Sequence, residues 1–181
     1  SLMLPAAERL LLGPGPSPIS PRVMRALGAP MLSHLDPQFV EIMDDLRARL
    51  ARVYQAPDGS FAFAVSGTGT SGMELAVANL VQPGTRVLSV VTGYFADRLA
   101  HIGTRYGGTV TRIEAEWGRA IDPEAVRRAL KASAADVVTV VHAETSTGVL
   151  NPVQEIAALA HEQGAIVVVD AVTSLGGMPL D

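Results

Sequence analysis

A short apolar run that is followed at once by a glycine-rich turn constrains this chain most. Phe61–Val65 has the length of a buried strand, and Ser66–Gly72 contains three glycines. After the turn, apolar residues recur at helical spacing from Met73 to Val81. A strand that passes through such a turn into a helix directs free backbone N–H groups and the positive helix end toward one point. The stretch indicates a phosphate site, and a tight strand-to-helix connection without a ligand is the alternative.

Strand-like and helix-like runs alternate along the rest of the chain. Two apolar runs, Val137–Val141 and Ile166–Val169, show no polar alternation, so we expect both of their faces to be buried. This order predicts an α/β fold, a mostly parallel sheet with helices on both faces. The predicted strands are Phe61–Val65, Arg86–Val91, Gly108–Ile113, Asp136–Val141 and Ala165–Asp170, and the predicted helices are Thr70–Val81, Phe95–Tyr106, Pro123–Ala132 and Val153–Gln163.

The amino-terminal part is rich in proline and glycine. Such a composition predicts an extended arm over residues 1–36, with one short helix near Pro21–Leu27. A long amphipathic helix is predicted to begin at Pro37, with Asp36 as its N-cap, and to end before Pro57. We therefore divide the chain into an arm, 1–36, and an incomplete cofactor-binding large domain, 37–181. The arm packs either on its own domain or on a second copy.

Composition excludes several classes of function. The net charge is −4 and no strong basic cluster is present, so we expect no nucleic-acid partner. The absence of cysteine excludes disulfides and thiolate ligands, and four scattered histidines give no metal-ligand spacing, so no metal site is expected. No apolar run is long enough to span a bilayer and no signal-peptide pattern begins the chain, so we expect a cytoplasmic protein without a membrane partner.

Polar and aromatic residues follow several of the predicted strands. They are the glycine turn, Thr92–Phe95, His142–Gly148 and Asp170. In an open parallel sheet, ligands bind beyond the carboxyl ends of the strands, so we expect these groups to converge at one edge.

The glycine spacing fits more than one phosphate compound. Gly67, Gly69 and Gly72 match a dinucleotide fingerprint, but that fingerprint needs an acidic residue roughly 20 positions on, and the next strand ends at Thr92 without one. No lysine follows the glycines, which excludes a P-loop. Pyridoxal 5′-phosphate fits better, because Asp170 closes an apolar strand where a carboxylate would pair with a pyridinium nitrogen. A turn or cap role for Asp170 is the alternative.

Four separated motifs carry a resemblance to a known family: Gly13–Ser17, Ser66–Thr70, Glu144–Pro152 and Val169–Gly177. In this order they resemble class V, fold-type I aminotransferases, specifically the amino-terminal portion of the alanine–glyoxylate and serine–glyoxylate (serine–pyruvate) group. The resemblance implies pyridoxal-phosphate-dependent transamination between a small 2-amino acid, alanine or serine, and a 2-oxo acid, glyoxylate or pyruvate. It also implies a homodimer.

The resemblance also implies roles for single residues. Phe95 stands where the family often has tryptophan, so ring stacking is kept and an indole donor is lost. The alternative for Phe95 is an aromatic residue of the core, and the alternative for Thr145 is a hydroxyl that caps a turn. We expect His142 and Glu144 only to order their loop. The implied roles are phosphate binding for Thr68, Gly69 and Thr70, ring stacking for Phe95, a hydroxyl near the ring oxygen for Thr145, a catalytic partner of the pyridine nitrogen for Asp170, an apolar ring contact for Val172 and a place near the substrate carboxylate for Gly15.

The Schiff-base lysine that the resemblance requires has no counterpart in the sequence. The chain contains one lysine, Lys131, at the end of a predicted helix, where we expect a surface cation. In the family the lysine follows a further strand, and a small domain completes the site. We therefore expect the amino-terminal part of a longer aminotransferase, inactive alone. An inert binding or scaffold remnant and a dinucleotide-binding oxidoreductase domain are the alternatives.

Overall fold

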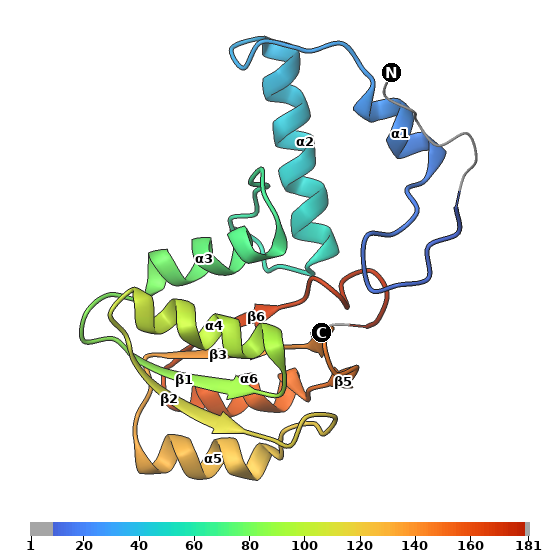
Figure 1. Cartoon of the computed structure of the whole chain (residues 1–181). Helices are drawn as coiled ribbons and strands as arrows, with labels where there is room; N and C mark the ends of the chain where they lie inside the picture. Colours follow the sequence, from blue (N-terminus) through green and yellow to red (C-terminus); the bar gives the residue numbers. More distant parts are fainter. Residues whose placement is uncertain (1–8, 180–181) are drawn as a thin grey trace. The chain divides into compact units, whose positions relative to one another are not determined.

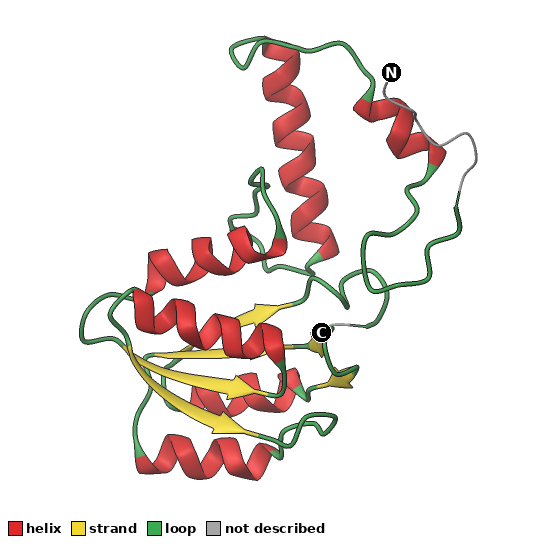
Figure 2. Ribbon diagram, viewed as in Figure 1, coloured by secondary structure: helices red, strands yellow, loops and turns green. Residues whose placement is uncertain are grey.

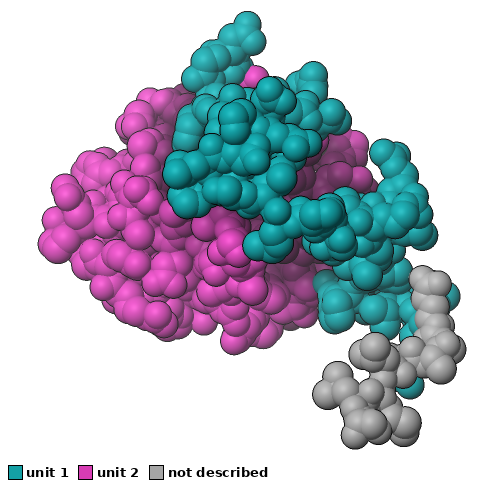
Figure 3. Space-filling view, turned by 90° about the horizontal axis from the view of Figure 1, so that it is seen from above, with its two compact units in different colours: residues 1–52, 57–63 teal, residues 53–56, 64–181 magenta. Residues whose placement is uncertain are grey.

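The computed structural model describes residues 9–179, which belong to two compact units (Figure 1). One unit comprises the chain up to Arg52 together with Pro57–Phe63, and the other comprises Val53–Ala56 and the chain from Ala64 onward (Figure 3). The division into an arm, 1–36, and a large domain, 37–181, stays a prediction.

Two helices that the sequence predicts belong to the first unit, apart from the last residue of the second helix. α1 spans Pro21–Leu27, and α2 spans Pro37–Val53. The Gln38 N–H donates to Oδ1 of Asp36 over 2.9 Å, so Asp36 acts as the predicted N-cap of α2. Neither helix has a fully buried side chain among the described residues.

The second unit is built on a four-stranded parallel sheet. Its strands are β1 (Arg86–Val91), β2 (Thr109–Glu114), β3 (Val137–Val141) and β6 (Ile166–Asp170), in the order β2-β1-β3-β6 (Figure 2). The helices are α3 (Gly69–Leu80), α4 (Tyr94–Arg105), α5 (Pro123–Ala132) and α6 (Val153–Glu162). Each of these elements begins and ends within one residue of its predicted bounds, and the predicted fold class is confirmed. A small antiparallel hairpin, β4 (Ala143–Glu144) and β5 (Val149–Leu150), lies where no strand is predicted.

Helices cover both faces of the sheet, and each face has its own apolar core. α3 and α4 lie on one face, and α5 and α6 lie on the other (Figure 1). The side chains of β3 point alternately into the two cores. Val137 belongs to the core that contains Met73 and Leu99, and Val138 belongs to the core that contains Ile156. β3 is buried along its whole length, as predicted for Val137–Val141.

The prediction of a strand at Phe61–Val65 is wrong. These residues pair with no strand among residues 9–179, and Phe61, Phe63 and Val65 are largely exposed. An apolar run becomes a strand only where a neighbouring strand accepts its backbone hydrogen bonds, and none does so in the described part of the chain. The glycine turn therefore follows an irregular segment.

The prediction that Ile166–Val169 is buried on both faces is also wrong. β6 is an edge strand of the sheet, and Ile166 and Val169 are 51% and 38% exposed. Burial of an apolar strand depends on how many layers and neighbours surround it, which the residue types alone do not specify.

An ion pair joins the amino-terminal ends of β1 and β3. The Asp136 carboxylate accepts hydrogen bonds from the Arg86 backbone N–H over 2.8 Å, from its Nε over 3.1 Å and from its Nη2 over 2.5 Å. These bonds, the side-chain ones first, lower the pKa of Asp136 to about 2. A carboxyl group with a lowered pKa stabilises the folded state above its ordinary pKa and loses that effect as the pH falls toward its lowered pKa.

We expect Asp136→Asn to lower the melting temperature at pH 7, by a few degrees at most because both side chains are about half exposed. The difference from the wild type should shrink as the pH falls from about 4 toward 2, which thermal unfolding followed by circular dichroism at several pH values measures. Asp58→Asn, at an exposed position, is the matched control. A difference that stays constant over this pH range would contradict the assignment.

Candidate functional site

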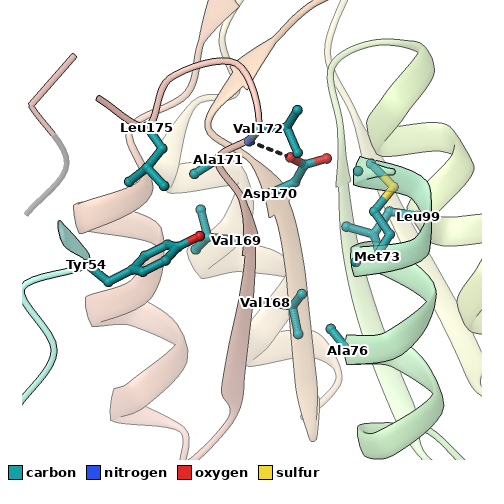
Figure 4. A pocket seen from close by; sticks show the side chains of 12 residues that line it. Tyr54, Met73, Ala76, Leu99, Val168, Val169, Asp170, Ala171, Val172 and Leu175 are labelled. Carbon is teal, nitrogen blue, oxygen red and sulfur yellow. Dashed lines mark hydrogen bonds between the residues drawn. The ribbon is translucent and has the colours of Figure 1, made fainter. Parts of the chain in front are cut away.

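A cavity of about 380 Å³ lies between the start of α3 and the end of β6 (Figure 4). Its walls are mostly apolar, with one carboxylate at the end of the strand. All of its residues belong to the second unit. They are Tyr54, Gly69, Gly72, Met73, Ala76, Leu99, Val168, Val169, Asp170, Ala171, Val172 and Leu175.

The glycine turn forms the entry to α3. Thr68 is the N-cap residue, and its N–H donates to Oγ of Ser71 over 3.3 Å. The N–H groups of Gly69 and Thr70, in the first helical turn, have no hydrogen-bond partner in the part of the chain that the structure describes. Together with the positive end of the helix, these N–H groups make the turn suited to an anion.

The turn lies directly against the segment that follows β6. A Cβ atom on Gly69 would come within 2.9 Å of Cγ2 of Val172, so only glycine allows this approach. Since Val172 is two residues from Asp170, the contact brings the turn and the carboxylate to the same cavity. The glycine turn and Asp170 are two of the four groups that the sequence predicts to converge.

Asp170 ends β6 and is partly buried. Its Oδ1 accepts the Val172 N–H over 2.9 Å, as Figure 4 shows, and no Arg, Lys or His side chain pairs with it within residues 9–179. Burial raises the pKa of Asp170, and the negative charge of Glu144 raises it further, while the Val172 N–H lowers it. A carboxylate in such a place would be stabilised by a cationic ligand.

Arg98 connects the glycine turn to the start of α4. Its Nη1 donates to Oγ1 of Thr70 over 2.5 Å, and its Nη2 donates to the Tyr94 hydroxyl over 3.0 Å. The guanidinium carbon lies 4.9 Å from the ring centre of Tyr94 and 5.2 Å from that of Phe95. No motif in the sequence indicates a role for Arg98. The one signal is its position three residues after Phe95, which places both residues on the same side of a helix.

Two contacts tie the loop after β3 to the segment after β6. The hydroxyls of Thr145 and Thr173 are hydrogen-bonded to each other. Nδ1 of His142 lies 2.9 Å from Oγ of Ser174, and burial lowers the pKa of the His142 imidazole. These contacts hold the loop that carries Thr145 against the segment that follows Asp170.

Two residues considered from the sequence are not among those that line the cavity. Gly15 belongs to the first unit and is exposed, so its place near a substrate stays a prediction. Lys131 is exposed in the last turn of α5, which leads into the amino-terminal end of β3. Asp170 lies at the other end of the sheet, where the strands have their carboxyl ends. The prediction that Lys131 is a surface cation is confirmed.

None of the helices in residues 9–179 combines the length and the apolar character that crossing a membrane requires.

Comparisons with known proteins agree along nearly the whole chain. An aminotransferase from Methanocaldococcus jannaschii is 37% identical over 97% of this chain and 46% of its own length. A crystal structure of alanine–glyoxylate aminotransferase from Nostoc sp. superposes with a TM-score of 0.91 at 43% identity, over 99% of this chain and 48% of that one. Ureidoglycine–glyoxylate aminotransferase from Bacillus subtilis superposes with a TM-score of 0.94 at 34% identity, over 98% and 46%.

The chain thus spans a little under half the length of these relatives. The model of the class-V aminotransferase family matches residues 12–181, which include the glycine turn, α4 and the segment after β6. The chain therefore belongs to the class-V aminotransferases.

Proposed function

We propose that this chain is the cofactor-binding part of an aminotransferase that uses pyridoxal 5′-phosphate. The observation that carries the proposal is the shared cavity: the free amides at the start of α3 and the carboxylate of Asp170 meet there without a charged partner of their own among the described residues. A small molecule with an anionic group at one end and a basic ring nitrogen at the other would satisfy both.

The residues present fit this cofactor by the chemistry of their groups. Thr68, Gly69 and Thr70 would hold the phosphate through backbone N–H and hydroxyl groups. Asp170 would keep a proton on the pyridine nitrogen, and in that state the bound ring serves as an electron sink for amino-group transfer. Phe95 would lie against one ring face.

On the other side of the ring, Val172 would supply an apolar contact. Thr145 would place a hydroxyl near the ring oxygen, where the Thr173 hydroxyl orients it. The Schiff-base lysine would come from outside these 181 residues, whose single lysine is Lys131.

The proposed reaction moves an amino group from a small 2-amino acid, alanine or serine, to a 2-oxo acid, glyoxylate or pyruvate. The names of the relatives support this choice, since glyoxylate is a substrate in those from Nostoc sp. and Bacillus subtilis. We further propose that the protein works as a homodimer, in which Gly15 of the arm lies near the substrate carboxylate.

We expect Asp170→Ala in the full-length protein to reduce alanine–glyoxylate transamination by at least about 10²-fold, because a preorganised charge beside the reacting group is lost. The far-UV circular dichroism spectrum should stay unchanged. Asp58→Ala serves as the control for loss of a carboxylate at an exposed site. Turnover near that of the wild type in Asp170→Ala would refute the role assigned to this carboxylate.

We expect Asp170→Asn to raise the melting temperature of the cofactor-free protein at pH 7. An acid whose pKa is raised by folding destabilises the folded state above that pKa, and an amide removes this cost while it still accepts the Val172 N–H. The advantage should vanish below about pH 4, where the carboxyl group is protonated in both states. Thermal unfolding against pH measures it, and a lower melting temperature of the variant at pH 7 would be the contrary result.

Added pyridoxal 5′-phosphate should reverse the order of these two melting temperatures. Ligand that binds the folded state raises stability in proportion to the logarithm of its concentration over Kd, and the variant should bind more weakly. An equal rise in the wild type and in Asp170→Asn would mean that the carboxylate does not contact the cofactor.

A further inference from the structure

Glu144 is a fully buried carboxylate that the proposed chemistry does not use. It is 1% exposed and lies in β4, directly before Thr145. Its Oε2 accepts the Ala96 N–H over 3.1 Å, and its Oε1 accepts the Phe95 N–H over the longer distance of 3.4 Å. Both N–H groups belong to the first turn of α4, so this carboxylate caps the helix that carries the proposed stacking ring.

Ser146 extends the same cap. Its Oγ donates to Oε1 of Glu144 over 2.7 Å and accepts the Tyr94 N–H over 2.9 Å. The segment Glu144–Ser146 therefore accepts the first three N–H groups of α4. The two polypeptide segments are about 50 residues apart in the sequence. This group of bonds joins them, together with the Thr147 hydroxyl, which donates to the Thr92 carbonyl over 3.2 Å.

The backbone at Gly93 is shaped to admit this carboxylate. A Cβ atom there would come within 2.5 Å of Cγ of Glu144 and within 2.6 Å of Oγ of Ser146. Any other residue at position 93 would push the segment away from α4, so the close approach depends on glycine.

The charge of Glu144 has no cationic side chain to balance it within residues 9–179. A buried carboxylate without such a partner is stable only where several hydrogen bonds point at it. Here the N–H groups and the positive end of α4 stabilise the charge of Glu144. The first turn of α4 and the loop of Thr145 consequently cannot move apart without leaving a charge uncompensated.

We propose that Glu144 is a positioning residue of the cofactor site. It fixes the position of the Phe95 ring on α4 relative to the Thr145 hydroxyl on the neighbouring loop. The inference rests on the proposed function. The inference goes beyond that function because Glu144 is not among the residues assigned to the cofactor or the substrate. It acts through Phe95 and Thr145, which are assigned to the cofactor.

The test compares Glu144→Gln with the wild type in the full-length protein. Glutamine keeps the size of the side chain but removes its charge and turns an NH₂ group toward one of the α4 N–H groups. We expect the Kd for pyridoxal 5′-phosphate to rise about tenfold or more, and the induced circular dichroism per bound cofactor to change, since that signal reports the orientation of the ring in its chiral surroundings.

Thr139→Val is the matched control. Thr139 is buried in β3, and its Oγ1 donates to Oγ of Ser89 over 2.9 Å, a bond between β3 and β1 that involves neither the first turn of α4 nor the loop of Thr145. This isosteric change removes one buried hydrogen bond, so it should lower the melting temperature and leave both the Kd and the induced signal unchanged. Ser146→Ala is a second test variant at an exposed position, and it should shift both readouts in the same direction as Glu144→Gln, but less.

Each outcome has a distinct meaning. If the wild type binds the cofactor while Glu144→Gln and Ser146→Ala bind it with the same Kd and the same induced signal, the positioning role is overturned and the proposed function stands. If Thr139→Val shifts both readouts as much as Glu144→Gln does, the effect is one of general stability and the inference is again overturned. If the wild type does not bind the cofactor, the proposed function fails and the inference falls with it.

Discussion

The contact between Gly69 and Val172 is the constraint on which the site depends. It joins a helix start to a strand end across 103 residues of sequence, and it exists only because position 69 has no side chain. Parallel pairing of β3 with β6 fixes where Asp170 lies, and the packing of α3 on α4 fixes where the glycine turn lies. The cavity is the space that these two arrangements leave between them.

Asp170 and Glu144 are both held without a cation within residues 9–179, but by different means. Glu144 is satisfied by the protein itself, through N–H groups and the end of a helix. Asp170 accepts one hydrogen bond, from the Val172 N–H, and burial raises its pKa because the charged form is only partly stabilised. The difference separates a group that supports the architecture from one that is available to a ligand.

Much of the fold follows from patterns within the sequence. Helical spacing and the Gly and Pro residues between the elements predict each helix and all four strands of the parallel sheet, since such signals act over a few residues. Phe61–Val65 and Ile166–Val169 show the limit of this method: both are apolar enough for a buried strand, yet one finds no partner among the described residues and the other lies at an edge. The same limit applies to the site. Asp170 and Gly69 stand out because they sit at motif positions, whereas Arg98 gains its place from a hydroxyl on another helix, which no local pattern indicates.

The open side of β6 gives the sheet a free row of backbone N–H and C=O groups in the described part of the chain. Such a row is a template for strand addition, whether by another segment of polypeptide or by an unrelated chain. Asp170 is the last residue of that strand and also lines the cavity, so a segment that paired with β6 would end beside the site. Backbone pairing along this edge and the negative charge of the site thus depend on the same short strand.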